Sequence, residues 1–210
     1  SLTHSFKEIV GIFLYEDTSD GRYYLGSSNR KPVAFRKIFG KAEIYQRIHG
    51  RSFLYSPLSF SQVNMSIVEQ FVAKAGELLG LMKEMRLVDL YCGYGLFALC
   101  LAENVDSVVG VEIAAESIDS AIANAKRQKA SNVRFLRSDI TVETLPHLLK
   151  QSRPNDVVLL DPPRSGTGSG VIECIAARKP ARVLHIFCNV EIMPAELKRW
   201  EASGYTIDKA

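Results

Sequence analysis

Two short segments of the chain hold the residue types that could do chemistry. Asp161–Arg164, with the sequence Asp-Pro-Pro-Arg, places a carboxylate, a stiff turn and a guanidinium directly after the apolar run Val157–Leu160. Cys188 directly follows a second apolar run, Val183–Phe187, and is followed by Asn189. A thiolate is a strong nucleophile, and proline removes backbone freedom from a turn. The two segments therefore suggest an enzyme that holds a flat substrate on a stiff loop and attacks it with sulfur.

A third segment, Asp89–Gly95, has the sequence Asp-Leu-Tyr-Cys-Gly-Tyr-Gly and indicates a ligand-binding turn. Gly93 and Gly95 remove side chains where a backbone must pass close to a ligand. The pattern is not the dinucleotide fingerprint, because Ala98 stands at the third glycine position, and no Gly-Lys-Ser/Thr follows to make a P-loop. A glycine-rich turn alone is weak evidence, since several nucleotide-binding folds use one.

Two acidic residues follow the next two apolar runs. Glu112 lies about 20 residues past the glycine turn, where a carboxylate can accept hydrogen bonds from two ribose hydroxyls. The alternative is a surface glutamate near a helix N-terminus, which the helix dipole favours. Asp139 stands at the level expected to face an adenine amine, or else it caps the next helix. Because the glycine turn precedes it in the sequence, we favour the ribose role for Glu112.

The elements that must position these residues alternate along the chain. Strands are expected at Leu87–Tyr91, Ser107–Glu112, Val133–Leu136, Val157–Leu160 and Val183–Phe187. Helices are expected between them, at Leu96–Ala102, Ala115–Lys129, Val142–Lys150 and Ser169–Ala177. This alternation predicts an α/β fold with a mainly parallel sheet, helices on both faces, and ligands at the carboxyl ends of the strands.

A further helix and a β-rich region are expected before the first of these strands. Asn64 is expected to cap a helix that Gly80 ends. Residues 1–60 hold short apolar runs between turn residues, including the hairpin signal at Asp20-Gly21. We therefore expect a small β-rich lobe over residues 1–60 and a ligand-binding domain over residues 61–210.

Charge, composition and cysteine spacing narrow the class of protein. The net charge of +3 is small, but the first 51 residues hold nine Lys and Arg against five Asp and Glu, so the β-rich lobe has either a solvated or an RNA-facing surface. No apolar stretch approaches the roughly 20 residues of a membrane span. The four cysteines form no CxxC pair, which argues against zinc and iron–sulfur sites and favours a reduced, cytoplasmic compartment. They are Cys92, Cys100, Cys174 and Cys188.

In combination, the motifs resemble the class I S-adenosylmethionine-dependent methyltransferases, whose fold is Rossmann-like. More narrowly, the chain resembles the RNA uracil-C5 methyltransferase family, which makes 5-methyluridine in tRNA and rRNA. The resemblance is carried by Phe60–Asn64, Asp89–Gly95, Val109–Glu112, Asn124-Ala125, Asp161–Gly166 and Cys188-Asn189. It implies S-adenosylmethionine as the cofactor and RNA as the partner, with no membrane, no metal and no obligate protein partner.

The resemblance also assigns a cofactor site. By position, it places cofactor contacts on Gln62, Tyr91, Glu112, Asp161 and the backbone of Leu96, where the family often has an asparagine. With Gly93, Gly95 and Asp139 from the patterns above, these residues make up the predicted cofactor site.

The implied reaction needs a thiol because C5 of uracil is a poor nucleophile. A thiolate added to C6 turns the ring into an enolate whose C5 attacks the sulfonium methyl. Cys188 is the predicted nucleophile, and a buried strand-end cysteine is the alternative. Asp161 is expected to orient the uracil or the cofactor. Arg164 either lowers the pKa of the thiol and pairs with an anion, or forms a structural salt bridge. His185 is expected on the opposite strand face from Cys188, so the two are not paired.

The chain departs from the family pattern in two ways. Phe187 and Val190 flank the Cys-Asn pair, where the family usually has Ser and Pro. The family's general base for the C5 proton, a glutamate further downstream, has no counterpart in Glu191, Glu196 or Glu201. Tyr205–Ile207 is expected to begin a sixth strand without a partner, which leaves the fifth strand as an open edge. We therefore expect the natural protein to continue beyond Ala210 and to carry an N-terminal RNA-binding lobe.

Two other functions stay open at this point. One is a Rossmann-like methyltransferase for a guanine amine or a small molecule, which needs no cysteine nucleophile. The other is a non-catalytic module that binds S-adenosylmethionine and contacts RNA through the basic front of the chain. Only the uracil-C5 reaction requires Cys188, so loss of activity without this residue would distinguish it from the two other functions. Methyl transfer of any kind would distinguish the other methyltransferase from the non-catalytic module.

Overall fold

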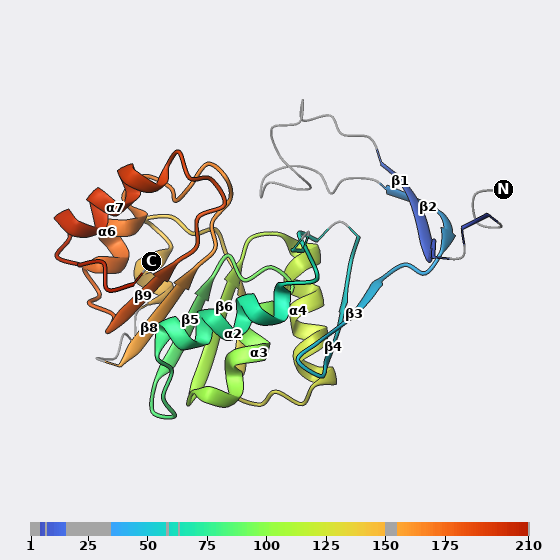
Figure 1. Cartoon of the computed structure of the whole chain (residues 1–210), viewed down its shortest axis with the longest axis horizontal. Helices are drawn as coiled ribbons and strands as arrows, with labels where there is room; N and C mark the ends of the chain where they lie inside the picture. Colours follow the sequence, from blue (N-terminus) through green and yellow to red (C-terminus); the bar gives the residue numbers. More distant parts are fainter. Residues whose placement is uncertain are drawn as a thin grey trace.

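The structure is a computed structural model that describes residues 5–6, 8–15, 35–57, 59–62, 64–149 and 155–209. The predicted hairpin at Asp20-Gly21 lies outside the described residues. Within them, two antiparallel strand pairs precede a five-stranded parallel sheet with the strand order β7-β6-β5-β8-β9 (Figure 1). Helices separate the strands along the chain, which confirms the predicted α/β class.

The elements of the sheet and its cover agree with most of the predicted ranges. The strands are β5 (Arg86–Leu90), β6 (Ser107–Glu112), β7 (Val133–Arg137), β8 (Asp156–Leu160) and β9 (Arg182–His185). The helices are α2 (Val68–Leu79), α3 (Leu96–Leu101), η1 (Ala102–Asn104), α4 (Ala115–Arg127), α5 (Leu145–Leu148), α6 (Val171–Ala176) and α7 (Met193–Ala202). In the described part of the chain, no helix has the length and apolar character that crossing a bilayer requires.

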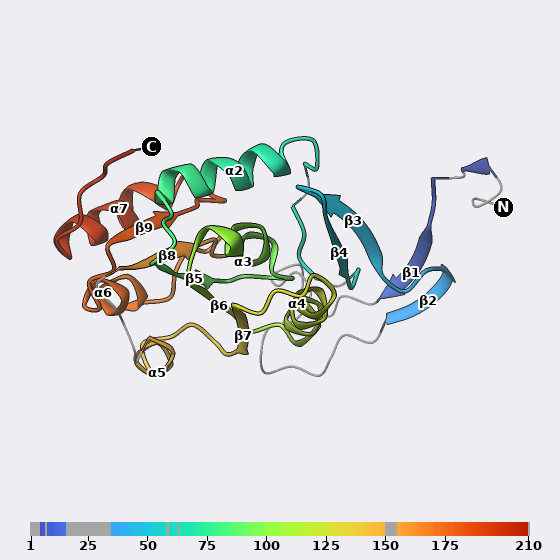
Figure 2. The ribbon, with the colours of Figure 1, turned by 90° about the horizontal axis from the view of Figure 1, so that it is seen from below.

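The sheet is buried on both faces, as its continuous apolar strands predict. Successive residues of a strand point to opposite faces. Val157 and Leu159 of β8 accordingly join a core cluster with α2 and α3, whereas Val158 and Leu160 join a second cluster with α5, α6 and α7. Figure 2 shows α2 and α5 on opposite sides of the sheet. The two clusters hold the strands rigidly, so the loops at their carboxyl ends have a firm base.

The start of α2 differs from the prediction, whereas its end agrees with it. Asn64 does not cap the helix, because its Oδ1 accepts hydrogen bonds from the N–H and hydroxyl of Ser66, at 3.2 and 2.7 Å, in a turn ahead of the helix. The helix begins only at Val68, after Ile67. Gly80 ends it with a φ of 56°, a left-handed conformation that glycine adopts without strain.

The last part of the chain departs most from the prediction. β9 ends at His185 rather than Phe187, so Cys188 lies in the loop after the strand. The predicted sixth strand at Tyr205–Ile207 is not a strand. Instead the Tyr205 ring packs edge-on against Trp200, and its hydroxyl donates to the Pro180 carbonyl at 2.9 Å. Tyr205 thereby helps to cover α7, a helix that the sequence analysis did not predict.

Two strand pairs stand before the sheet, as the β-rich texture of the N-terminal region predicts. β1 (Gly11–Tyr15) pairs with β2 (Phe35–Gly40), and β3 (Ile44–Ile48) pairs with β4 (Arg51–Tyr55). Figures 1 and 2 both show β1 and β2 further from the central sheet than β3 and β4. Three side chains of the second pair belong to the core cluster of α2 and α3, so β3 and β4 pack as part of that core. They are Ile48, Phe53 and Tyr55.

The hairpin between β3 and β4 has a two-residue turn, His49-Gly50. Both residues have positive φ, 48° and 72°, as the type I′ turn that suits twisted strands requires. A positive φ is uncommon for residues other than glycine, although histidine adopts it more often than most. The His49 N–H donates to Oε1 of Glu69 at 2.6 Å, and its ring contacts the Glu69 carbonyl at 2.8 Å, so α2 holds the turn in place.

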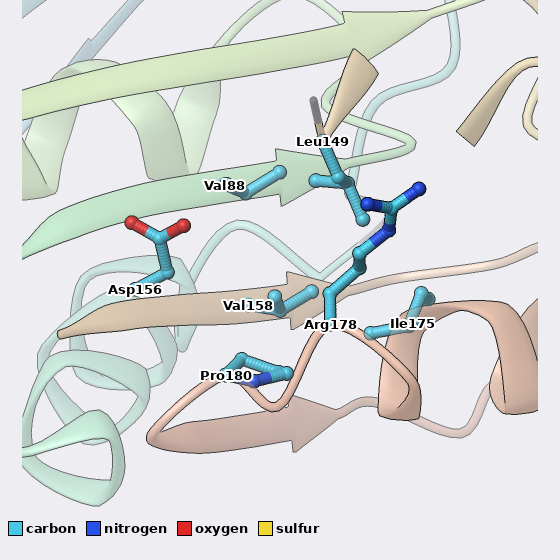
Figure 3. Close-up of a pocket in the computed structure, with 7 residues that line it drawn as sticks. All are labelled: Val88, Leu149, Asp156, Val158, Ile175, Arg178 and Pro180. Atoms are coloured by element: carbon cyan, nitrogen blue, oxygen red, sulfur yellow. The ribbon is translucent and has the colours of Figure 1, made fainter. Parts of the chain in front are cut away.

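A small cavity lies at the amino end of the sheet, away from the predicted ligand edge. Its volume of about 10 Å³ is room for about one water molecule, so it is too small for a substrate or a cofactor. Beside it, Arg86 and Asp156, the first residues of β5 and β8, form a buried ion pair with an Nε–Oδ1 distance of 3.0 Å. The residues that line the cavity are Val88, Leu149, Asp156, Val158, Ile175, Arg178 and Pro180 (Figure 3).

Candidate functional site

The loops after β5, β6, β8 and β9 gather most of the predicted site residues at one edge of the sheet. These strands are parallel, so their carboxyl ends meet at the same edge. Leu90 of β5 and Leu160 of β8 are register partners. The next residue, Asp161, donates its backbone N–H to the Leu90 carbonyl at 3.4 Å. The glycine turn and the Asp-Pro-Pro-Arg loop therefore start side by side.

The glycine turn has an unusual backbone, with left-handed φ values at alternate residues. These are Tyr91 at 66°, Gly93 at 53° and Gly95 at 86°. The two glycines serve different purposes. A Cβ on Gly95 would lie 2.7 Å from the Phe135 ring, whereas a Cβ on Gly93 would meet nothing nearer than the Phe60 carbonyl oxygen at 4.0 Å. Gly95 is required by packing, and Gly93 leaves one side of the turn open.

Glu112 lies against the glycine turn, as the cofactor prediction requires. One carboxylate oxygen accepts the Gly93 N–H at 3.1 Å, and the other accepts the N–H groups of Ile113 and Ala114, both at 2.8 Å. A carboxylate has about four lone-pair sites for hydrogen bonds. The three backbone bonds fix its orientation and leave acceptor capacity for hydroxyl groups of a ligand.

Asp89, which the sequence analysis treated only as the first residue of the motif, is fully buried under the turn. Its Oδ2 accepts the N–H of Ala98 in α3 at 2.9 Å, and its Oδ1 has no hydrogen-bond partner among the described residues. Burial raises the pKa of this carboxyl group to about 8, with smaller contributions from the charges of Asp161 and Glu112. Asp89 is therefore largely protonated at neutral pH.

Asp161 and Cys188 meet between the loops after β8 and β9. The Cys188 thiol donates to Asp161 Oδ1 at 3.7 Å, and the side-chain amide of Gln62 donates to Oδ2 at 3.2 Å. Gln62 comes from the segment before α2, 99 positions earlier in the chain. Burial raises the pKa of Asp161 to about 6, although the two hydrogen bonds lower it. The structure thus brings three of the predicted residues into contact.

Cys188 is an exposed residue whose sulfur is partly buried, and the pKa of its thiol is raised. Burial of the sulfur is the largest cause, followed by the charge of Asp161 and its hydrogen bond. Arg164 lowers the pKa, as predicted, but its effect is the smallest of those acting on the thiol, so the net shift is upward from 9.0. Arg164 is exposed, and it takes part in none of the salt bridges found among the described residues.

Asp139 and Leu96 are less closely tied to the other predicted residues. Asp139 Oδ1 accepts the N–H of Ile140 at 2.8 Å, in a turn ahead of α5. Its backbone carbonyl accepts the hydroxyl of Thr144 at 2.7 Å. The Leu96 side chain is buried in the core, which agrees with the prediction that only its backbone could serve a ligand.

The sequence analysis named His185 and Glu196 but assigned neither a role in the site, and the structure buries both side chains behind it. Glu196 binds the loop that starts at Asp161, and His185 lies between Glu196 and Trp200. One signal was available in the sequence. Glu196 and Trp200 are four residues apart, so a helix over this segment would place both on one face. No group of three His, Cys, Asp or Glu side chains arranged to hold a metal ion occurs among the described residues.

Comparison with a solved structure identifies the fold. The tRNA (uracil-54, C5)-methyltransferase of Pyrococcus abyssi, solved with S-adenosyl-L-homocysteine, matches 100% of this chain and 48% of its own, with a TM-score of 0.71 and 23% identity. The fold, with its five parallel strands and helices on both faces, is that of the Rossmann-like class I methyltransferases.

Within that class, the chain belongs to the tRNA (uracil-5-)-methyltransferase family, whose sequence profile matches residues 24–210. A relative from Listeria monocytogenes, an uncharacterized RNA methyltransferase, is 34% identical over 83% of this chain and 38% of its own length. The 23S rRNA (uracil(1939)-C(5))-methyltransferase of Psychromonas ingrahamii is 34% identical over 75% of this chain and 35% of its own length. The chain thus spans about two fifths of the length of these relatives.

Proposed function

We propose that this chain methylates C5 of a uridine in tRNA or rRNA with S-adenosylmethionine, through a covalent bond between Cys188 and C6 of the ring. The observation that carries the proposal is the contact between the Cys188 thiol and the Asp161 carboxylate, 3.7 Å long, at the ligand edge of the sheet. Family membership supports uracil in RNA as the substrate class.

The residues around the glycine turn fit S-adenosylmethionine. The turn from Tyr91 to Gly95, with left-handed φ at alternate residues, leaves Gly93 open to a ligand, and Glu112 keeps acceptor capacity for ribose hydroxyls. Tyr91, Gly93, Gly95 and the backbone of Leu96 would line the cofactor, Asp139 would face its adenine, and Gln62 and Asp161 would border its reactive end. When bound, the cofactor supplies an electrophilic methyl group.

Cys188 and Asp161 would act on the uracil ring. The thiol proton must leave before sulfur attacks, and Asp161 Oδ1 is the acceptor that already contacts it. The bond from sulfur to C6 then forms as the C5–C6 π electrons move toward O4, which makes C5 nucleophilic. Gln62, bound to the other oxygen of Asp161, holds the carboxylate in place.

Two surfaces would contact the RNA. Arg164 is exposed beside the thiol and carries a charge suited to a phosphate. The strand pair β1–β2 and strand β3 present basic and aromatic side chains to solvent. These include Arg36, Lys37 and Phe39 of β2 and Tyr45 of β3. Single-stranded RNA is held by this combination of cationic groups and exposed rings.

A short RNA carrying 5-fluorouridine tests the proposal, because fluorine at C5 cannot leave as a proton and the thiol stays bound to C6. We expect a denaturant-stable protein–RNA band in the presence of S-adenosylmethionine. Cys188→Ala should abolish the band. Cys174→Ala, which removes a partly buried cysteine of α6, should retain it. A band that persists without Cys188 would contradict the proposed nucleophile. No band from a chain that binds S-adenosylmethionine would favour a methyltransferase without a cysteine nucleophile or a non-catalytic module.

A further inference from the structure

Buried Glu196 of α7 binds the loop that carries Asp161 and Arg164. Its Oε1 accepts the backbone N–H of Thr167 at 2.8 Å and the Thr167 hydroxyl at 2.5 Å. The neighbouring Gly166 has a φ of 81°, and a Cβ there would lie 2.8 Å from the same oxygen. The loop therefore passes directly over the carboxylate, at a distance that only glycine permits.

The other carboxylate oxygen of Glu196 faces the segment that leads to Cys188. It lies 3.4 Å from Nε2 of His185, the last residue of β9. Trp200 Nε1–H, which can only donate, is 3.1 Å from Nδ1 of His185, so Nδ1 accepts and the ring proton lies on Nε2, toward Glu196. The His185 ring also stacks on Phe187 at a centroid distance of 4.1 Å, directly before the cysteine.

Among the described residues, Glu196 has no other partner that explains its burial. It is 5% exposed, and its nearest cation, Arg199, is 4.0 Å away and already forms two hydrogen bonds with Glu173, at 2.9 and 2.7 Å. His185 gives little charge compensation, because burial lowers its pKa to about 4 and the ring is neutral at pH 7. A buried carboxylate is costly unless donors surround it. In the described structure, the Thr167 N–H and hydroxyl donate to one oxygen, whereas the other oxygen has no hydrogen-bond partner and faces Nε2 of His185 at 3.4 Å.

We propose that Glu196 is a positioning residue that holds the Asp161 loop and the Cys188 segment in register, through Thr167 on one side and His185 on the other. The inference rests on the proposed function, since it assigns Glu196 to the same site. It differs from a general-base role, because Glu196 acts only through the residues that it holds.

Glu196→Gln keeps the shape of the side chain but cannot keep both the contact with Thr167 and the contact with His185. A glutamine has one acceptor oxygen and one donor nitrogen. Its nitrogen must face either the donors of Thr167 or the N–H of His185, so one of the two contacts becomes unfavourable. The thiol then moves away from Asp161, whose charge and hydrogen bond raise the thiol pKa. We expect the free thiol to become more reactive and the covalent capture of uracil to become less efficient.

The test measures both properties in the same variants of the full chain. Iodoacetamide alkylation of Cys188 at pH 7.5 is followed by mass spectrometry of its peptide, and 5-fluorouridine RNA capture is followed on denaturing gels. Thr167→Val, which removes only the hydroxyl donor, serves as a second and milder variant. Glu201→Gln, an exposed glutamate of the same helix, is the control. Circular dichroism fixes a temperature at which every variant is folded.

We expect alkylation of Cys188 to rise about threefold or more in Glu196→Gln, because the thiol pKa falls when Asp161 no longer contacts the sulfur, and RNA capture to fall about tenfold. Thr167→Val should move both rates in the same directions by less, and Glu201→Gln should leave both unchanged. Alkylation rates within about twofold of the parent in both folded variants would overturn the positioning role, since a purely structural residue changes only stability. If the parent chain captures no RNA, the proposed function fails, but alkylation still decides the role of Glu196.

Discussion

Cys188 carries a protonated thiol in the resting protein. Burial and the carboxylate of Asp161 raise its pKa above 9.0, whereas Asp161 itself has a pKa of about 6 and is mostly ionised at pH 7. The thiolate therefore forms only transiently in the free protein. This arrangement limits unwanted alkylation or oxidation of an exposed cysteine, since the thiolate is the reactive form.

Asp161→Asn should make the thiol more acidic. The change removes the charge that raises the pKa of Cys188, while the amide oxygen can still accept the Gln62 hydrogen bond. In the parent, the rate of Cys188 alkylation should increase with pH to a midpoint above 9.0. In Asp161→Asn, the midpoint should fall below that of the parent, because the charge of Asp161 no longer opposes ionisation of the thiol. Equal midpoints in the two proteins would contradict the assigned contact.

Asp89 gives a separate prediction about stability. Its pKa is about 8 in the folded protein, compared with the usual 3.8. A raised carboxyl pKa favours the folded state at low pH, and this contribution is lost as pH rises toward 8. Relative to Asp89→Asn, which cannot ionise, the free energy of unfolding of the parent should fall by up to about 1.4 kcal/mol per pH unit between these two values. Urea denaturation at pH 5, 6 and 7 measures this difference, and a difference that does not vary with pH would refute it.

At the scale of residues, the position of a side chain is predictable from the sequence where a single local motif determines it. The glycine turn, Glu112, Asp161 and Cys188 follow apolar strands, and the structure places them at one edge. Gln62 was assigned by family resemblance alone, because its partner Asp161 is 99 positions away. The roles of Glu196 and His185 depend on how a loop and a helix meet in space, and no local pattern encodes that meeting.

At the scale of elements, α4 completes the hydrogen bonding of strand β4. Side chains four residues apart, Ser120 Oγ and Asn124 Oδ1, accept the N–H groups of Ser56 and Leu54, at 3.4 and 2.9 Å. Four residues after Asn124, Gln128 Nε2 donates to the carbonyl of Ser52, which lies two residues before Leu54, at 3.0 Å. Four helical residues rise about 6 Å and two strand residues rise about 6.6 Å, so the two elements stay in step.

Asn124→Ala should destabilise the protein by about 1–3 kcal/mol, because the Leu54 N–H loses its acceptor in a partly buried place. Asn124 also donates to the Tyr94 carbonyl in the glycine turn at 3.4 Å, so the same change should loosen the turn. Urea denaturation gives the free energy of unfolding. The control is Asp119→Ala, an exposed change on the same helix that should stay within about 0.5 kcal/mol of the parent. Equal effects from the two changes would argue against the side-chain ladder.

Element types were predictable from periodicity, but some boundaries were not. The apolar run to Phe187 predicts a strand that reaches this residue. In the structure, the last backbone hydrogen bond to β8 runs from the Ile186 N–H to the Leu160 carbonyl, and the chain then leaves the sheet. The helix expected over Val142–Lys150 is only Leu145–Leu148. Asp139 and Thr141 bind backbone and side-chain groups of their own turn, which competes with helix formation there.

At the scale of the whole molecule, the alternation of strands and helices predicts the parallel sheet and its two covered faces. The strand order follows less directly, because it depends on which faces the helices cover. The order β7-β6-β5-β8-β9 leaves β9 at one edge of the described sheet, as expected for the fifth strand. Division of the chain at residue 60 remains a prediction, and the core contacts of Ile48, Phe53 and Tyr55 associate β3 and β4 with the larger domain.

The central claim is that the sulfur of Cys188 adds to C6 of a uridine in RNA. The most direct measurement isolates the complex with 5-fluorouridine RNA, digests protein and RNA, and locates the modified residue by tandem mass spectrometry. We predict a peptide in which Cys188 carries one 5-fluorouridine nucleotide, with an added methyl group when S-adenosylmethionine is present. The nucleotide attached to Cys92, Cys100 or Cys174, or a methylated uridine produced equally well by Cys188→Ala, would contradict the account.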